Sequence, residues 1–160
     1  MKPILFQLTF ALVVIGCDFG ERPKPEPLTA TFKLTDTTGR ETATFRSGEN
    51  FDFSFAITNT SDQQITYHKG DSGPVASFTI LQGDSVVATS LDGYVLLMVA
   101  TTGHLQPGQN LGENWRAPNT PARDPQIVLS PGLYEAQLSF VGFDEAEVKQ
   151  IPPLTFSITQ

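Results

Sequence analysis

The sequence predicts an all-β fold built from short strands and tight turns. Its 160 residues include 12 Phe, 3 Tyr and 1 Trp, and 13 glycines and 12 prolines supply the residues that turns need. Apolar and polar residues alternate along several stretches, which is the pattern of half-buried strands. From residue 28 onward no stretch has a convincing 3.6-residue period, so helices are not expected there.

The first strands are expected where this alternation begins. Residues 51–58 show it most clearly, because Phe or Ile stands at every second position. Residues 28–35 alternate in the same way. The sequence Asn-Thr-Ser-Asp at 59–62 has turn chemistry, and a further strand is expected to start at 64–68.

The remaining strands are expected in apolar runs or alternating stretches, at 75–81, 85–89, 94–100, within 105–115, at 132–142 and at 154–158. Gln82-Gly83-Asp84 joins the first two of these as a hairpin. The polar, Pro-rich stretch 116–131 is expected to be a surface loop. Short strands at this spacing predict a two-sheet antiparallel sandwich of the immunoglobulin-like kind, with about seven to nine strands.

The N-terminus has the pattern of a lipoprotein leader. After Lys2, residues 4–15 are apolar except for Gln7 and Thr9, a run too short for a bilayer that needs about 20 residues. Val14-Ile15-Gly16-Cys17 then resembles the lipobox that lipoprotein signal peptidase recognises, with Gly16 at the scissile bond and the Cys17 thiol as lipid acceptor. We therefore predict a helical signal peptide at 1–16 and lipidation of Cys17. An ordinary signal peptide with an incidental Cys, or a buried N-terminal strand, is the alternative.

A tether is expected between this leader and the domain. Residues 22–27 alternate proline with charged residues, which favours an extended polyproline II chain. We assign 17–27 to the lipidated Cys and its tether, about 30 Å long at roughly 3.1 Å per residue, and 28–160 to the sandwich domain. Asp18 resembles an inner-membrane retention signal of enterobacteria, and the choice between inner and outer membrane stays open.

Composition excludes two classes of protein. The formal net charge is −7 and no basic stripe is interleaved with aromatics, so a nucleic-acid partner is not expected. The hydrophobic fraction of 39% excludes wholesale disorder. Because Cys17 is the only cysteine, no internal disulfide can form.

A family resemblance covers residues 48–141. Its features are a strand ending in Asn59-Thr60-Ser61-Asp62, a Gly/Ser loop at 70–73, Phe78-Thr79-Ile80, a Leu-Gln-Pro-Gly-Gln turn at 105–109 leading to Trp115, and Leu-Ser-Pro-Gly-Leu-Tyr at 129–134. In these features the chain resembles the BsuPI-type proteinase-inhibitor family of small immunoglobulin-like domains. The resemblance implies the same sandwich, a hydroxyl of Tyr134 that bonds nearby backbone, and inhibition of a protease as one option.

The sequence holds motifs that suggest catalysis without completing it. Gly70-Asp71-Ser72-Gly73-Pro74 is one glycine short of the run around the nucleophile of trypsin-like proteases. The one upstream histidine, His68, lies two residues before it, and no orienting acid is evident. Gly83-Asp84-Ser85-Val86 resembles a lipase motif but lacks the α/β setting. We therefore expect no enzyme and read both motifs as turns.

Metal and cofactor sites are not expected either. His68 and His104 are the only histidines, and no second thiol is present to complete a transition-metal site. Acidic residues are spread through turns, and weak calcium binding at 144–147 stays open beside a solvated charged loop. The covalent lipid on Cys17 is the only added group predicted.

Together these features predict an extracytoplasmic lipoprotein of the cell envelope, held on a lipid bilayer by its acyl anchor. Its sandwich would bind a protein or polymer partner through loops, and the candidate contacts are Asp71, Ser72, Gly73 and Trp115. A protease is one such partner. The alternative is an accessory or structural envelope lipoprotein without a discrete binding site.

Overall fold

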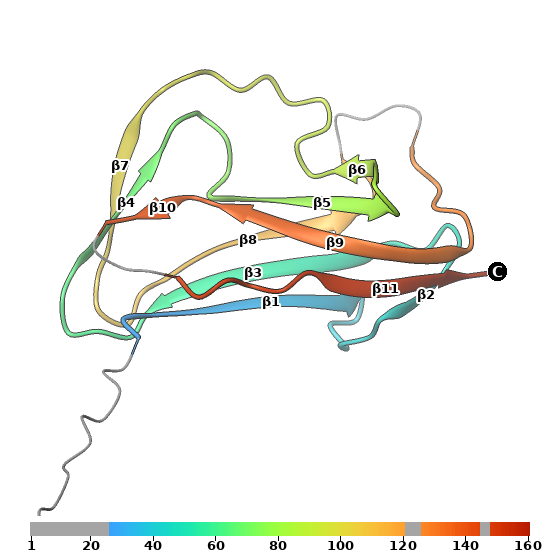
Figure 1. Ribbon diagram of the computed structural model, residues 1–160, viewed down its shortest axis with the longest axis horizontal. Coiled ribbons are helices and arrows are strands. Elements are labelled where there is room, and N and C mark those ends of the chain that lie inside the picture. Colours follow the sequence, from blue (N-terminus) through green and yellow to red (C-terminus); the bar gives the residue numbers. More distant parts are fainter. Residues whose placement is uncertain (1–25, 121–125, 145–147) are drawn as a thin grey trace, which may run out of the picture.

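The predicted all-β sandwich is confirmed. The computed structural model describes residues 26–120, 126–144 and 148–160, and these form strands joined by turns and loops (Figure 1). The predicted signal peptide, the lipobox 14–17 and most of the tether lie outside the described residues. In the described parts the strands are β1 (Leu28–Asp36), β2 (Thr44–Arg46), β3 (Phe51–Asn59), β4 (Ile65–Lys69), β5 (Ala76–Gln82), β6 (Ser85–Thr89), β7 (Thr101–Leu105), β8 (Asn110–Ala117), β9 (Gly132–Phe140), β10 (Gly142–Phe143) and β11 (Leu154–Thr159).

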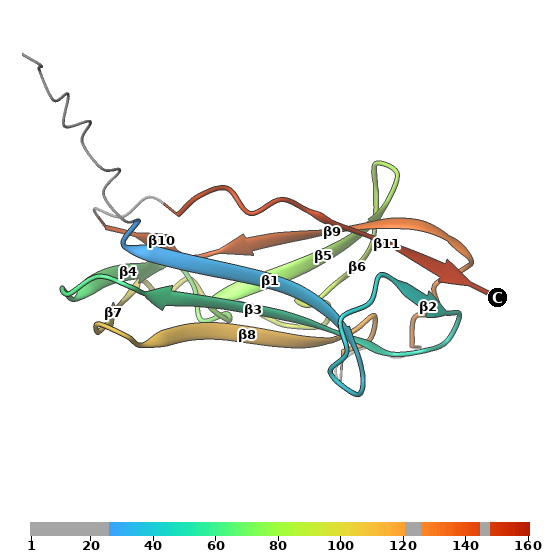
Figure 2. The ribbon, with the colours of Figure 1, turned by 90° about the horizontal axis from the view of Figure 1, so that it is seen from below.

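Two larger sheets form the sandwich. One has the order β1-β3-β8 and the other β2-β11-β9-β5-β6, and every pair is antiparallel except β2 with β11. Setting β2 and β6 aside, this is the A-B-E and G-F-C order of immunoglobulin-like sandwiches. A third sheet, β10-β4-β7, was not foreseen, and Figures 1 and 2 show it at one end of the molecule.

The core follows the alternation of β3. Phe51, Phe53, Phe55 and Ile57 are buried, as predicted. Phe53 is fully buried, and its ring centroid lies between 5.6 and 6.1 Å from those of five other aromatic side chains. Asp52 is partly exposed, and there it accepts hydrogen bonds from the Arg116 guanidinium across the pair with β8. The period-two pattern therefore assigned both faces of this strand correctly.

The predicted turn at 59–62 is built on a buried side chain. Asn59 is 0% exposed, and its amide nitrogen donates to the carbonyls of Gln63 (2.7 Å) and Leu105 (2.8 Å). Its side-chain oxygen accepts from the backbone N–H and the hydroxyl of Ser61. One amide thus ties the end of β3 to the turn and to the end of β7, and its own buried polar atoms are all satisfied.

Tyr134 has the structural role that the resemblance implied. Its hydroxyl donates to the Ser130 carbonyl at 2.7 Å, and its ring stacks on Phe156 with centroids 5.5 Å apart. Burial raises the pKa of this phenol. The side chain fixes the start of β9 against the loop before it, as a tyrosine corner does.

Two expectations about elements are wrong. Residues 94–100 form no strand, and the strand in this region is β7, which begins at Thr101. The stretch 116–131 is not a simple surface loop, because β8 continues to Ala117 and because Ala117, Thr120 and Leu129 are buried. Strand pairing places the strand at β7, and packing against the rest of the chain buries residues within 116–131. Local polarity predicts neither outcome.

Candidate functional site

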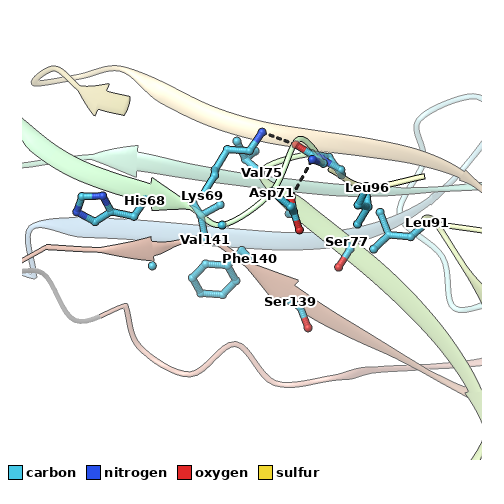
Figure 3. Close-up of a pocket in the computed structure, with 15 residues that line it drawn as sticks. His68, Lys69, Asp71, Val75, Ser77, Leu91, Leu96, Ser139, Phe140 and Val141 are labelled. Atoms are coloured by element: carbon cyan, nitrogen blue, oxygen red, sulfur yellow. Dashed lines mark hydrogen bonds between the residues drawn. The ribbon is translucent and has the colours of Figure 1, made fainter. Parts of the chain in front are cut away.

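The candidate loop 70–74 connects β4 to β5 and is closed by its own polar groups. The Asp71 carboxylate accepts a hydrogen bond from the Gly73 N–H at 2.8 Å. The Lys69 ammonium donates to the Gly73 carbonyl (Figure 3). After the loop, Val75 N–H donates to the Glu113 carboxylate of β8 at 3.0 Å. The loop is therefore braced by a bond of its own, by Lys69 at the end of β4 and, just after it, by Glu113 of β8.

Position 73 requires glycine because a side chain there would collide with its neighbours, and not because its backbone has a positive φ. A Cβ at this position would lie 2.9 Å from an Asp71 carboxylate oxygen and 3.2 Å from a methyl carbon of Leu96. Gly73 does not have a positive φ, whereas Gly83 in the β5–β6 hairpin has φ of 57°. Any larger residue at 73 would push the Asp71 side chain out of its turn.

Ser72 holds a neighbouring segment in place. Its N–H donates to the Leu97 carbonyl at 2.8 Å, and its hydroxyl oxygen accepts from the Leu97 N–H at 3.0 Å. The N–H and the hydroxyl oxygen of Ser72 thus both bond to the backbone of one residue from the β6–β7 connection. This explains a serine at position 72 without any chemistry at its hydroxyl.

The histidine beside the loop does contact an acid, contrary to the expectation from sequence. His68 Nε2 lies 2.9 Å from the Asp144 carboxylate, and His68 Nδ1 lies 3.1 Å from the Thr102 hydroxyl. Both ring nitrogens are therefore engaged, and Ser72 is not among their partners. The side chains of a serine–histidine–acid triad are present, but the described structure does not connect the serine to the histidine.

We predict that Ser72 is not a nucleophile. A serine hydroxyl needs a base to take its proton, and here the hydroxyl oxygen accepts a backbone N–H while His68 is held by other partners. Residues 18–160 incubated with a fluorophosphonate probe should give no covalent adduct by intact-mass spectrometry. Stoichiometric labelling that disappears in both Ser72→Ala and His68→Ala would overturn this prediction.

A shallow pocket of about 320 Å³ lies beside the loop. Figure 3 shows its wall formed by the loop, by the end of β9 and by Leu91 and Leu96. Polar groups of Ser77 and Ser139, which pair across β5 and β9, stand beside the apolar surfaces of Phe140 and Leu96. The lining residues are His68, Lys69, Gly70, Asp71, Gly73, Pro74, Val75, Ala76, Ser77, Leu91, Leu96, Ser139, Phe140, Val141 and Gly142.

Of the four predicted contacts, the structure groups three and separates one. Asp71, Ser72 and Gly73 share the loop, and Asp71 and Gly73 line the pocket. Trp115 does not belong to a binding loop: it lies in β8, is 6% exposed, and stacks on Phe53. Its indole N–H donates to the Asn119 carbonyl at 3.0 Å. Because the ring completes the core and its one donor is satisfied, Trp115 is a packing residue.

The described residues contain no group of three His, Cys, Asp or Glu side chains that could hold a metal ion. Asp144, the first residue of the proposed calcium loop, is bonded to His68, and residues 145–147 lie outside the described residues. The lipidation site Cys17 and its recognition residues Val14, Ile15 and Gly16 lie outside them too.

Comparison with protein-family models and with curated proteins found no match. Among solved structures, the chain is similar to a β-glucosidase from Listeria innocua bound to glucose (14% identity, TM-score 0.40), covering 83% of this chain and 16% of that one. The chain is also similar to a β-glucosidase from Erythrobacter marinus, with 11% identity and a TM-score of 0.41. That match covers 82% of this chain and 15% of the β-glucosidase. An alkylpurine DNA glycosylase from Pseudomonas fluorescens matches with 11% identity and a TM-score of 0.40. That match covers 84% of this chain and 31% of the glycosylase. The chain spans under a third of each of these proteins, and likeness at this level carries no argument about function.

Proposed function

We propose that this chain is a membrane-anchored extracytoplasmic lipoprotein whose immunoglobulin-like sandwich is a binding module and not an enzyme. The acyl anchor on Cys17 would hold it on a bilayer of the cell envelope. The loop 70–74 and the pocket beside it would contact a protein or polymer partner. A protease is one partner of this kind, on the resemblance of residues 48–141 to BsuPI-type inhibitors.

The observation that carries the anchor is the position of the only cysteine. Cys17 follows Val14-Ile15-Gly16 at the end of a short apolar run, and the Pro-rich stretch comes directly after it. In the described part of the chain, no helix has the length and apolar character that crossing a membrane requires. Two or more acyl chains, each contributing about 0.8 kcal/mol per buried methylene, would anchor the domain stably.

The geometry favours binding by the loop over catalysis. Loops that rigid strands fix in one conformation lose little entropy when a partner binds. Bonds from Lys69, Asp71 and Ser72 hold loop 70–74 in this way, and the pocket opens directly beside it.

Lipidation is tested by metabolic labelling of the full chain in a bacterial host. An alkyne fatty acid should label the wild type and should not label Cys17→Ser, because the thiol is the acceptor. Ser47→Ala serves as a control substitution that leaves the lipobox intact. Equal labelling of wild type and Cys17→Ser would refute the anchor.

The alternative is an accessory envelope lipoprotein without a discrete binding site. One observation favours it: the polar groups of the candidate loop are already bonded within the domain. Purification from detergent-solubilised native membranes separates the two hypotheses. A structural subunit should co-purify at fixed stoichiometry with a larger assembly. A binding module should yield a partner that Gly73→Leu, which disturbs the Asp71 turn, releases. An inhibitor should give saturable inhibition of a serine protease.

A further inference from the structure

The connection from β6 to β7 exposes an apolar segment, residues 94–99. The side chains of Tyr94, Val95, Leu97, Met98 and Val99 are between 45% and 89% exposed. Leu96 differs, because it turns inward to line the pocket. Figure 1 shows the connection running along the outside of the sandwich between β6 and β7. So many large apolar side chains in one exposed stretch mark an interaction surface.

Most backbone groups of the apolar segment also have no hydrogen-bond partner among the described residues. Both polar groups of Leu97 bond to Ser72. Within the described residues, no hydrogen bond reaches the backbone N–H or C=O of Val95, Leu96, Met98 or Val99. The backbone groups of Leu96 and Met98, on either side of Leu97, are therefore left for another partner. A strand laid along the segment would bond to them.

The side chains suit a second copy of the same segment. From Gly93 to Gly103 no residue is charged, whereas the chain as a whole carries −7. Two copies therefore repel each other over most of their surface and least at this segment. Tyr-Val-Leu-Leu-Met-Val contains neither glycine nor proline. Its apolar, uncharged composition is typical of segments that pair with their own copies. Antiparallel pairing about a two-fold axis would give the backbone groups of both copies the same hydrogen bonds.

A bilayer is a poorer occupant. Backbone groups without partners are costly in hydrocarbon, where no water is present to bond them. A lipid surface would cover the apolar side chains and leave the N–H and C=O groups of Leu96 and Met98 unpaired. A strand from another chain covers the side chains and bonds the backbone at once.

We propose that residues 94–99 form a self-association site, at which two copies of the chain pair their apolar segments as antiparallel strands. This inference goes beyond the proposed function and does not depend on lipidation. The interface is small, so the dimer is of the weak class, with a dissociation constant between about 1 µM and 1 mM.

The test is sedimentation equilibrium of residues 18–160 from about 1 µM to 1 mM. These residues include the whole described core, which runs from Leu28 to Ile158. The wild type should pass from monomer to dimer. Val95→Asp and Met98→Asp should each raise the dissociation constant at least about tenfold, because a charge would be buried in the interface. Met98→Pro, which removes one unbonded N–H, should do the same, while Met98→Leu should not.

Matched controls separate this site from other causes. Leu133→Asp adds a charge at another exposed apolar residue, 66% exposed, and should leave the dimer intact. Urea melts check that every variant is folded. A wild type that stays monomeric at 1 mM refutes the proposal, as does a dimer that Val95→Asp and Met98→Asp leave unchanged. Binding of a monomeric wild type to phosphatidylcholine vesicles, lost in Met98→Asp, would assign the segment to a bilayer and also refute it.

Discussion

Phe53→Ala is expected to lower the free energy of unfolding by about 3–5 kcal/mol, the usual cost of truncating a buried phenylalanine. Phe53 is 0% exposed and its ring stands among those of Phe32, Phe51, Phe78, Trp115 and Phe156, which belong to both larger sheets. Alanine leaves a cavity between the sheets that these neighbours fill only in part. The measurement is a urea melt of residues 18–160, extrapolated linearly to zero denaturant.

The matched control for this prediction is Leu133→Ala. Leu133 is 66% exposed on β9, so its truncation removes an apolar side chain without opening a cavity and should change stability by less than about 0.5 kcal/mol. A difference below about 1 kcal/mol between Phe53→Ala and the wild type would mean that the face assigned to β3 is wrong.

Asn59→Ala should cost about 2–4 kcal/mol, which is large for a polar side chain. The substitution removes the donors to the Gln63 and Leu105 carbonyls and the acceptor for Ser61, and it does so where the side chain is 0% exposed. The Leu105 carbonyl loses a buried hydrogen bond, and a buried polar group left without a partner costs about 1–3 kcal/mol. The Gln63 carbonyl keeps its bond from the Ser61 hydroxyl. The same urea melt measures the change.

Asn114→Ala provides the comparison, since Asn114 is exposed in the middle of β8. It should lie within about 0.5 kcal/mol of the wild type. Asn59→Asp tests the polarity of the contact, because a carboxylate cannot donate to the two carbonyls and should destabilise at least as much as alanine. If Asn59→Ala were as stable as Asn114→Ala, the network drawn around Asn59 would be incorrect.

The sequence predicted the elements whose side chains alternate and missed those defined by pairing. β3 and β9 were found because one face of each faces the core. The strand at β7 was placed too early because residues 94–100 are the more apolar. Thr101–Leu105 forms a strand because it pairs with β4, where the Tyr67 ring occupies the space over Gly103. A Cβ at Gly103 would meet that ring, a contact that single-sequence reading does not reveal.

The sequence predicted those parts of the candidate site that lie within one loop, and it missed the contacts between residues far apart in the chain. Asp71 and Gly73 were singled out by the turn character of their loop, and they do line the pocket. The contact of His68 with Asp144 joins residues 76 positions apart, and no motif links them. Trp115 was misplaced because a lone tryptophan in a strand looks the same from sequence whether its ring faces solvent or the core.

The parallel pairing of β2 with β11 has a consequence for the rate of folding. Thr44 and Ser157, which face each other in this pair, are 113 residues apart, and Phe156 of β11 packs on Phe45 and Phe51. The aromatic core thus stays incomplete until the last strand of the domain has been synthesised. Loops of this length close slowly, so we expect the domain to complete its fold only once β11 has been synthesised, and more slowly than a helical domain of equal size.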